Sequence, residues 1–226
     1  MQDVVERALA QIAGEPLGVT CAGRTDRGVH ARLQVVHFDT SVQRPASAWV
    51  RGVNALLPDT VAVLWSREVP DEFHARFSAL ARVYRYELLN RPVRPALGAS
   101  QVGWFHLPLD VDRMRAAAAL FVGEHDFSAF RSAECQAKSP VRTIHGFEIL
   151  RDRDRIDFLV RANAFLHHMV RNLVGTLVYV GKGNLDPRDV VDILHSKDRS
   201  KAAPTFGPEG LHLEKIEYEA KWSLPV

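Results

Sequence analysis

The chain contains very little cysteine. Only Cys21 and Cys135 occur among its 226 residues, far apart and outside any CxxC pair. Their number and spacing exclude a disulfide-bonded scaffold and a four-thiolate zinc site. Hydrophobic residues make up 46% of the chain, which is enough for a packed core and argues against general disorder.

Long apolar segments are also absent. No apolar run approaches the roughly 20 residues that are needed to span a bilayer. The first residues, MQDVVERALAQIAGEP, carry acids where a signal peptide has its apolar core. We therefore expect a cytoplasmic protein that has no membrane partner.

The sequence has no large excess of either charge. A net charge of +2 is too small to indicate a polyanionic partner, so any case for nucleic acid depends on where the charges lie. Lysine occurs at only six positions, and arginine supplies the other basic residues. The planar fork of arginine suits carboxylate and phosphate, although a GC-rich genome produces the same bias.

Hydrophobic periodicity predicts two successive groups of helices and strands. In the first group we expect helices over 3–13 and 45–58 and strands over 17–21, 34–38 and 60–69. In the second group we expect strands over 82–89, 101–107 and 210–220, a hairpin of 141–150 with 155–162, and helices over 110–122 and 165–180, with a short helix opening at 186–187. The second group follows the ferredoxin-like order of strand, helix, strand, strand, helix, strand.

These elements predict an α+β fold of two ferredoxin-like halves around a central antiparallel sheet, with the active site in the cleft between them. Residues 1–90 would form the N-terminal half and residues 101–226 the C-terminal half, joined by a segment with prolines at 92 and 95. The first half matches the pattern only if one strand precedes residue 1, so we expect the first N-terminal strand to be missing. Losing a central strand would expose ladder groups and apolar surface.

The segment AGRTDRGVHA at 22–31 is the most informative stretch of the sequence. It is a polar, glycine-bearing loop between predicted strands, where functional residues tend to be displayed. The guanidinium of Arg24 is close enough in sequence to keep the carboxylate of Asp26 ionised and available as a nucleophile. On local chemistry alone, a glycine turn with an exposed ion pair is the simpler interpretation.

The whole string, followed by QVVHF at 34–38, resembles the signature of the TruA family of tRNA pseudouridine synthases. The resemblance continues in order through VNALLP at 53–58, FHARFSA at 73–79, YRYEL at 84–88, GEHDFSAF at 123–130, ANAFLHHMVRN at 162–172 and GLHL at 210–213. It therefore extends over nearly the whole chain.

The resemblance implies a role for several residues. Asp26 matches the catalytic carboxylate, and Arg24 and Arg171 match the basic residues that approach it. Tyr84 matches the aromatic residue that stacks on the target base. The substrate-binding set that we predict is Tyr84, Arg27, Arg76, Arg82, Arg85 and His168, with the arginines contacting RNA phosphates. The alternatives are a core aromatic at Tyr84 and a solvated helix face at Arg171.

The reaction implied is the isomerisation of uridine to pseudouridine. The N1–C1′ bond breaks, the uracil turns, and a new bond forms at C5, so neither a cofactor nor a metal is required. The carboxylate can attack or deprotonate the ribose, or add to the base, and the sequence does not choose among these. The resemblance places the target uridines at positions 38, 39 and 40 of the anticodon stem-loop of tRNA, and makes the working unit a homodimer.

Other chemistries have weaker support. His167 and His168 would point about 100° apart on a helix and would seldom share an ion, so we expect no metal. Hydrolase chemistry lacks a nucleophile-elbow motif, and an RRM-like module lacks an RNP1 pattern. The main rival is a catalytically weak RNA-binding protein. The sequence departs from the family at its start and at Arg27, where alanine is usual, and we expect Arg27 to point outward and contact a phosphate.

Overall fold

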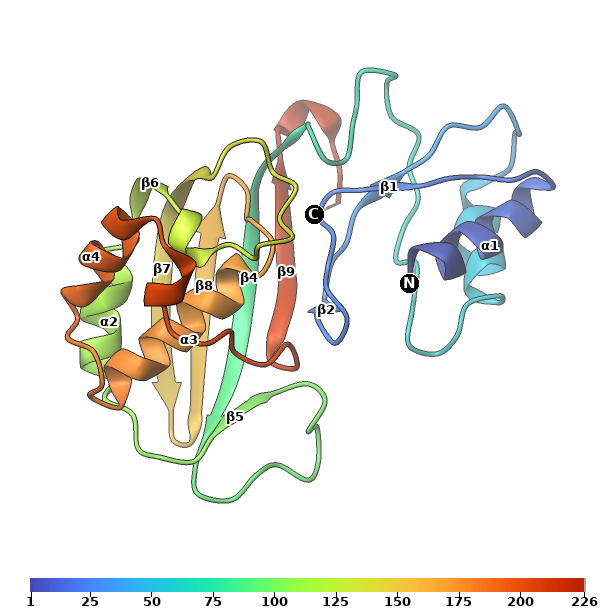
Figure 1. Cartoon of the computed structure of the whole chain (residues 1–226). Helices are drawn as coiled ribbons and strands as arrows, with labels where there is room; N and C mark the ends of the chain where they lie inside the picture. The colour runs from blue at the N-terminus through green and yellow to red at the C-terminus, as the bar shows by residue number, and fades with distance from the viewer. Residues whose placement is uncertain (226) are drawn as a thin grey trace. The chain divides into compact units, whose positions relative to one another are not determined.

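The computed structural model describes residues 1–225 of the chain (Figure 1). These residues group into two compact units. Unit 1 contains Met1–Arg24, Gln34–Ala79 and the residues from Tyr218 onward, and unit 2 contains Thr25–Leu33 and Leu80–Glu217. The segment 90–100, which we predicted as the connector between two halves, lies inside unit 2. The division into 1–90 and 101–226 stays a prediction.

Unit 2 is built on a mostly antiparallel sheet of seven strands. The strand order is β2-β9-β4-β8-β7-β6, and β5 pairs with β4. The strands are β2 (His30–Ala31), β4 (Ala79–Asn90), β5 (Gly103–Phe105), β6 (Gly123–Asp126), β7 (Val141–Asp152), β8 (Arg155–Ala162) and β9 (Leu211–Tyr218). The pairs β4·β8, β7·β8 and β6·β7 are antiparallel, whereas β2·β9 and β4·β5 are parallel.

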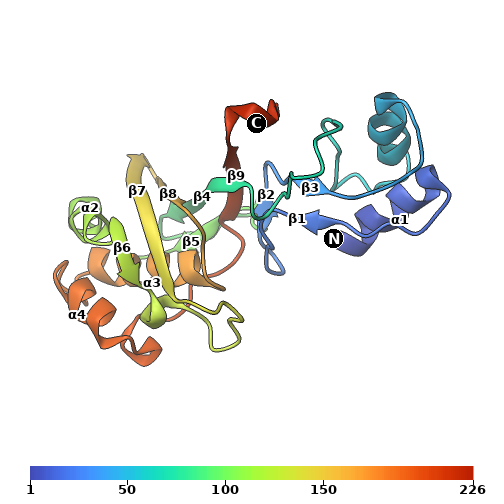
Figure 2. The ribbon, with the colours of Figure 1, turned by 90° about the horizontal axis from the view of Figure 1, so that it is seen from above.

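Helices cover one face of this sheet (Figures 1 and 2). They are α2 (Val111–Ala119), α3 (Met169–Gly181) and α4 (Asp189–Ser196), with short 3-10 turns η2 (Ser128–Phe130) and η3 (Arg199–Lys201) beside them. Strand β8 shows the consequence of period-two alternation. Its residues Ile156, Phe158 and Val160 are fully buried, while the intervening residues are partly or fully exposed.

Unit 1 is smaller and has little regular strand. Its elements are α1 (Gln2–Ala13), β1 (Thr20–Cys21), β3 (Val36–His37), the π-helical turn η1 (Ala48–Gly52) and the 3-10 turn η4 (Ala220–Trp222). Strands β1 and β3 pair antiparallel. Leu9 of α1, Trp49 and Val53 are buried in one apolar cluster. Helix α1 ends as predicted at Gly14, whose left-handed φ of 82° lets its N–H donate to Ala10 O at 2.8 Å.

Sequence periodicity predicted unit 2 better than unit 1. The strands over 82–89, 141–150, 155–162 and 210–220 and the helix over 110–122 are present as β4, β7, β8, β9 and α2. The strand predicted over 60–69 is absent, and that prediction is wrong. The side chain of Asn54 accepts from Val63 N at 2.7 Å and donates to Val63 O at 2.8 Å. A side-chain amide thus takes the backbone groups that a strand would offer to a neighbouring strand.

The helix predicted over 165–180 begins later than expected. His168 has a left-handed φ of 63° and precedes the first residue of α3, Met169. Asn172, the residue after Arg171 on this helix, is fully buried. The segment 202–206 packs against α3 at Gly175, where a Cβ would lie 2.2 Å from Pro204 O. Glycine therefore permits the close approach that encloses this side of the helix.

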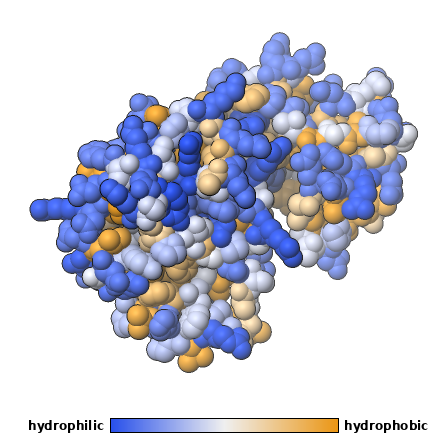
Figure 3. Space-filling view, in the orientation of Figure 1, coloured by the Kyte–Doolittle hydropathy of each residue, from blue (hydrophilic) through white to orange (hydrophobic). Residues whose placement is uncertain are grey.

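The face of the molecule shown in Figure 3 is mainly polar. Hydrophilic residues cover most of the face shown in Figure 3, and hydrophobic residues form smaller patches among them. None of the helices within residues 1–225 is both long enough and apolar enough to cross a membrane.

Candidate active site

The loop before β2 presents Asp26 to the start of α3. A tight turn follows Asp26, because Val29 N donates to Asp26 O at 3.1 Å. Gly28 in this turn has φ +84°, and a Cβ there would lie 2.9 Å from Pro208. Both the backbone conformation and the space favour glycine. The GRTDRG sequence thus folds into a fixed turn that orients one carboxylate.

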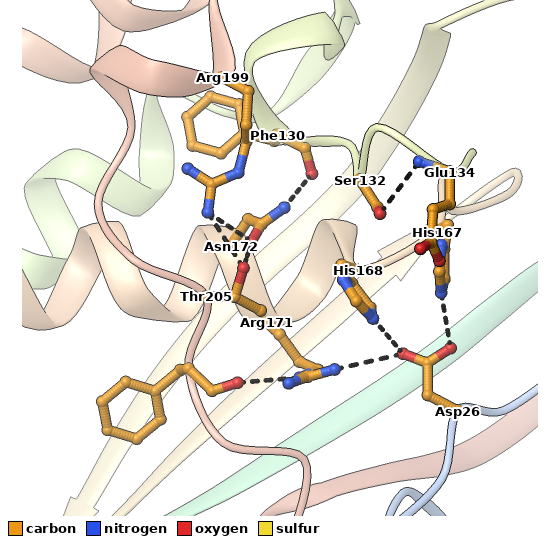
Figure 4. Close-up of polar contacts among 11 residues, drawn as sticks. Asp26, Phe130, Ser132, Glu134, His167, His168, Arg171, Asn172, Arg199 and Thr205 are labelled. Carbon is orange, nitrogen blue, oxygen red and sulfur yellow. Dashed lines mark hydrogen bonds and ion pairs between the residues drawn. The ribbon is translucent and has the colours of Figure 1, made fainter.

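Three donors hold the Asp26 carboxylate (Figure 4). His167 Nε2 lies 3.2 Å from Oδ1, and His168 Nε2 lies 3.3 Å from Oδ2. Arg171 Nη1 also approaches Oδ2, at 3.4 Å. The Asp26 side chain is 26% exposed, so it remains accessible to a substrate.

All three donors come from the first turn of α3 and the two residues before it. The left-handed backbone of His168 turns the chain into the helix, and Asn172 N donates to His168 O at 3.0 Å. Ser132 N donates to His167 O at 2.9 Å, which ties the residue before the helix to another loop. The positive end of the helix dipole also favours an anion at this position.

The donors differ in charge. Burial, followed by the neighbouring His167, lowers the pKa of His168 below its usual value of 6.5. His168 is therefore neutral near pH 7 and offers Asp26 one N–H. Arg171 supplies the permanent positive charge beside the carboxylate.

Arg171 is fixed from both of its ends. Its side chain is only 14% exposed, and its Nε donates to Phe206 O at 2.8 Å. In return, Phe206 N donates to Arg171 O at 3.2 Å. The position of the guanidinium therefore depends on the segment 199–206.

A buried polar network anchors that segment. Asn172 Nδ2 donates to Phe130 O at 2.7 Å, while its Oδ1 accepts from Arg199 Nη2 at 3.0 Å and from Thr205 Oγ1 at 2.7 Å. Arg199 also donates to Thr205 Oγ1 at 3.0 Å, and burial lowers the pKa of Arg199. Sequence reasoning missed this network because its members lie up to 75 residues apart, from Phe130 to Thr205.

One group of side chains among residues 1–225 has ligand atoms close enough to hold a metal ion. The ligand atoms of Asp26, His167 and His168 lie within 4.8 Å of one another. The predicted reason against a shared ion, two histidines on one helix, is wrong because both precede α3. Two imidazoles and a carboxylate suit zinc, but the guanidinium of Arg171 competes for Oδ2. No metal is needed for the predicted reaction, and the absence of one stays a prediction.

Two of the substrate-binding residues predicted on β4 are buried and already contact other parts of the protein. Tyr84 is 8% exposed, and its ring meets Phe165 edge to face at 5.0 Å. Arg82 is also 8% exposed and donates to Asn163 O at 2.9 Å. A contact of either residue with RNA would require these neighbours to shift.

The remaining predicted arginines are more accessible. Arg85, with a side chain 31% exposed, pairs with Asp157 at 3.4 Å and Glu214 at 3.5 Å. Arg27 is exposed, as we expected. Arg24 and Arg76 are exposed in unit 1. The structure thus brings Arg171 and His168 to Asp26, together with His167, which the sequence interpretation did not select.

The fold and the site define a mixed α+β protein with one carboxylate held by three donors at the start of a helix. The family model described as tRNA pseudouridine synthase matches residues 1–78 and 117–219. The chain belongs to the tRNA pseudouridine synthase family, and the predicted enzyme class, a pseudouridine-forming isomerase, is confirmed.

Curated relatives are similar in sequence over the whole chain. The tRNA pseudouridine synthase A of Dechloromonas aromatica is 56% identical over 225 residues, which are 100% of this chain and 86% of that protein. The protein of the same name from Chromobacterium violaceum is 58% identical over 226 residues, with the same two shares. That of Thiobacillus denitrificans is 57% identical over 225 residues, again 100% of this chain and 86% of the relative.

Proposed function

We propose that this chain isomerises uridine to pseudouridine at positions 38, 39 and 40 in the anticodon stem-loop of tRNA, with Asp26 as its catalytic nucleophile. The observation that carries the proposal is the partly exposed carboxylate held on both oxygens by His167, His168 and Arg171. Fixed donors restrict the direction of the carboxylate, which a carboxylate nucleophile requires.

The two oxygens of Asp26 are held unequally. Oδ2 faces both His168 and Arg171, whereas Oδ1 faces only His167, whose side chain is 33% exposed. We infer that Oδ1 is the reacting oxygen and that His167 releases it when uridine enters. This assignment serves attack on the ribose, its deprotonation and addition to the base equally well.

The target uridine must leave its stack to reach Asp26. An aromatic face compensates for the lost stacking, and we assign that role to Tyr84, whose ring has to part from Phe165. Arg24 would be a further basic residue that contacts the Asp26 carboxylate. The basic residues Arg27, Arg76, Arg82 and Arg85 and the imidazole of His168 would contact the RNA.

The finer description of the architecture belongs to the same proposal. Two ferredoxin-like halves, 1–90 and 101–226, would form the active-site cleft, and two copies of the chain would bind tRNA in the cytoplasm. The order β4, α2, β7, β8, α3, β9 is that of one ferredoxin-like unit, although its first strand, β4, lies within 1–90. Sedimentation equilibrium tests the dimer, since the 25.3 kDa chain would give twice its mass.

The decisive assay is release of tritium from unmodified tRNA labelled with [5-³H]uridine. We expect release by the parent, none by Asp26→Asn, and parental release by Asp59→Asn, a matched change at an exposed aspartate. Salt-dependent tRNA binding without release by the parent would favour the RNA-binding rival. Release by Asp26→Asn at the parental rate would remove the nucleophile assignment.

Arg27 has a separate test. If it contacts a phosphate, Arg27→Ala will weaken tRNA binding and reduce the slope of log K against log salt by about one. Unchanged affinity and slope would remove this contact and leave the proposed chemistry intact.

A further inference from the structure

Phe77 of unit 1 places an aromatic ring in solvent. It is 77% exposed, which makes it the most exposed phenylalanine or tryptophan within residues 1–225. A phenylalanine ring normally stabilises a fold by being buried in the core, and Phe77 does not do so. An exposed ring is common at a binding surface when its neighbours are suited to a ligand.

The side chains around Phe77 are cationic or aromatic. The His74 ring stacks on Phe77 with a centroid distance of 4.2 Å and an interplanar angle of 29°. The guanidinium carbon of Arg76 lies 5.8 Å from the Phe77 centroid. We define these three residues as the Phe77 platform.

The turn that carries the platform is held by its own polar groups. Ser78 N donates to His74 O at 2.8 Å, and His74 N donates to Ser78 Oγ at 3.0 Å. His74 Nδ1 accepts from the backbone N–H groups of Arg76 and Phe77, both at 3.2 Å. These bonds fix the backbone on both sides of the exposed ring.

Ala75, in the middle of the turn, is anchored to the rest of unit 1. Its N–H donates to His37 Nδ1 at 3.1 Å, and its carbonyl accepts from Tyr218 OH at 2.7 Å. The preceding Phe73 is buried against Tyr218 and Trp222, with ring centroids 5.4 Å apart in both cases. The exposed ring is thus presented by a preorganised turn, which lowers the entropic cost of binding.

We propose that the Phe77 platform stacks an unpaired nucleobase of the RNA substrate, other than the uridine that reacts at Asp26. A flat ring beside a guanidinium fits a base and its adjoining phosphate, because stacking and cation–π contacts accept any base. The polar neighbours His74, Arg76 and Ser78 suit a nucleobase better than an apolar protein groove. This inference rests on the proposed tRNA substrate.

Equilibrium binding of unmodified tRNA tests the platform, measured by fluorescence anisotropy in the Asp26→Asn background. Stacking contributes enough per base that Phe77→Ala should weaken binding about 5- to 100-fold. Phe77→Trp keeps a stacking face and should bind as well as the background protein. Leu64→Ala removes a side chain of unit 1 that is 67% exposed and should change Kd less than about twofold.

Salt dependence separates stacking from charge. Phe77→Ala should leave the slope of log K against log salt unchanged, whereas Arg76→Ala should lower it by about one. A Phe77→Ala protein with the Kd of its background overturns the proposal. So does a Phe77→Ala protein with a lower molar mass in sedimentation, since the ring would then bind a second copy of the chain.

The proposal and the proposed enzyme activity can fail independently. Tritium release by the parent, together with an unaffected Kd for Phe77→Ala, retains the activity and removes the platform. Weakened tRNA binding by Phe77→Ala, together with no tritium release by the parent, retains the platform on an RNA-binding protein.

Discussion

Replacing Asn172 by leucine should destabilise the fold and slow the reaction together. Asn172 is fully buried, and leucine has the same branched arrangement of four side-chain heavy atoms, so the change mainly removes polar contacts. It deletes the bonds to Phe130 O, to Thr205 Oγ1 and to the guanidinium of Arg199. The Phe130 carbonyl then loses this donor in the buried interior, and Thr205 and Arg199 lose their partner at part-buried positions.

The magnitude follows from the three contacts. Two neutral hydrogen bonds contribute about 0.5–1.5 kcal/mol each, and one bond to a charged group contributes about 1.5–3 kcal/mol. We therefore expect Asn172→Leu to lower the free energy of unfolding by about 4 kcal/mol. Thr205→Val removes one neutral bond from Asn172 and should cost about 1 kcal/mol.

The effect on activity arises through Arg171. Thr205 precedes Phe206, whose carbonyl holds the Arg171 guanidinium, so loosening this segment frees the guanidinium that faces Asp26. We expect the single-turnover rate of Asn172→Leu to fall roughly tenfold or more at saturating tRNA, because misplaced catalytic groups slow reactions on that scale.

Urea unfolding and single-turnover tritium release measure both effects. Asn184→Leu is the control, because this exposed asparagine should tolerate leucine within about 0.5 kcal/mol. A loss of less than about 1 kcal/mol for Asn172→Leu would refute the reasoning, since even its two neutral bonds predict that much.

Three further changes test the turn, the charge and the metal preference of the site. Gly28→Ala adds a Cβ against Pro208 at a φ of +84° and should slow single-turnover tritium release several-fold at unchanged tRNA affinity; an unaltered rate would contradict this. Because burial keeps the pKa of His168 below 6.5, the folded state binds fewer protons than the unfolded state, so its stability contribution is present above pH 6.5 and is lost as pH falls through the folded pKa. Urea midpoints taken between about pH 7.5 and about pH 5 should therefore fall further for the parent than for His168→Asn, whose asparagine tolerates the left-handed backbone; equal falls would show that His168 does not contribute. Dialysis against EDTA should leave the initial rate unchanged, and a loss restored by zinc would assign an ion to Asp26, His167 and His168.

The sheet of unit 2 was predictable because its strands are long and regularly patterned. In β4, Tyr84, Tyr86 and Leu88 alternate with residues of the opposite face, and its twelve residues are enough to show the two-residue period of a strand. Strands β1 and β3 have two residues each, too short for any period. The sequence near Val63 also resembles that of a strand, and only the bond of Val63 to the side chain of Asn54 shows that it is not one.

The motifs predicted the site more fully than periodicity did. They selected Asp26, Arg171 and His168, which the structure brings together. A metal shared by His167 and His168 was not expected, because a helix was predicted to run through both. The helix instead starts after His168, and no local sequence pattern predicts the left-handed backbone of that residue. Because the helix begins there, both imidazoles point toward the Asp26 carboxylate.

The division of the three donors between the two oxygens of Asp26 explains why the site suits a reactive carboxylate. A carboxylate that faces several fixed cations is well stabilised, and that stabilisation is lost when an oxygen turns to a substrate. Here Arg171 and the neutral His168 share Oδ2, so most of the fixed interaction is made by one oxygen. Releasing Oδ1 requires only the loss of its contact with His167. The same arrangement therefore keeps the Asp26 carboxylate oriented while one oxygen remains available for the proposed chemistry.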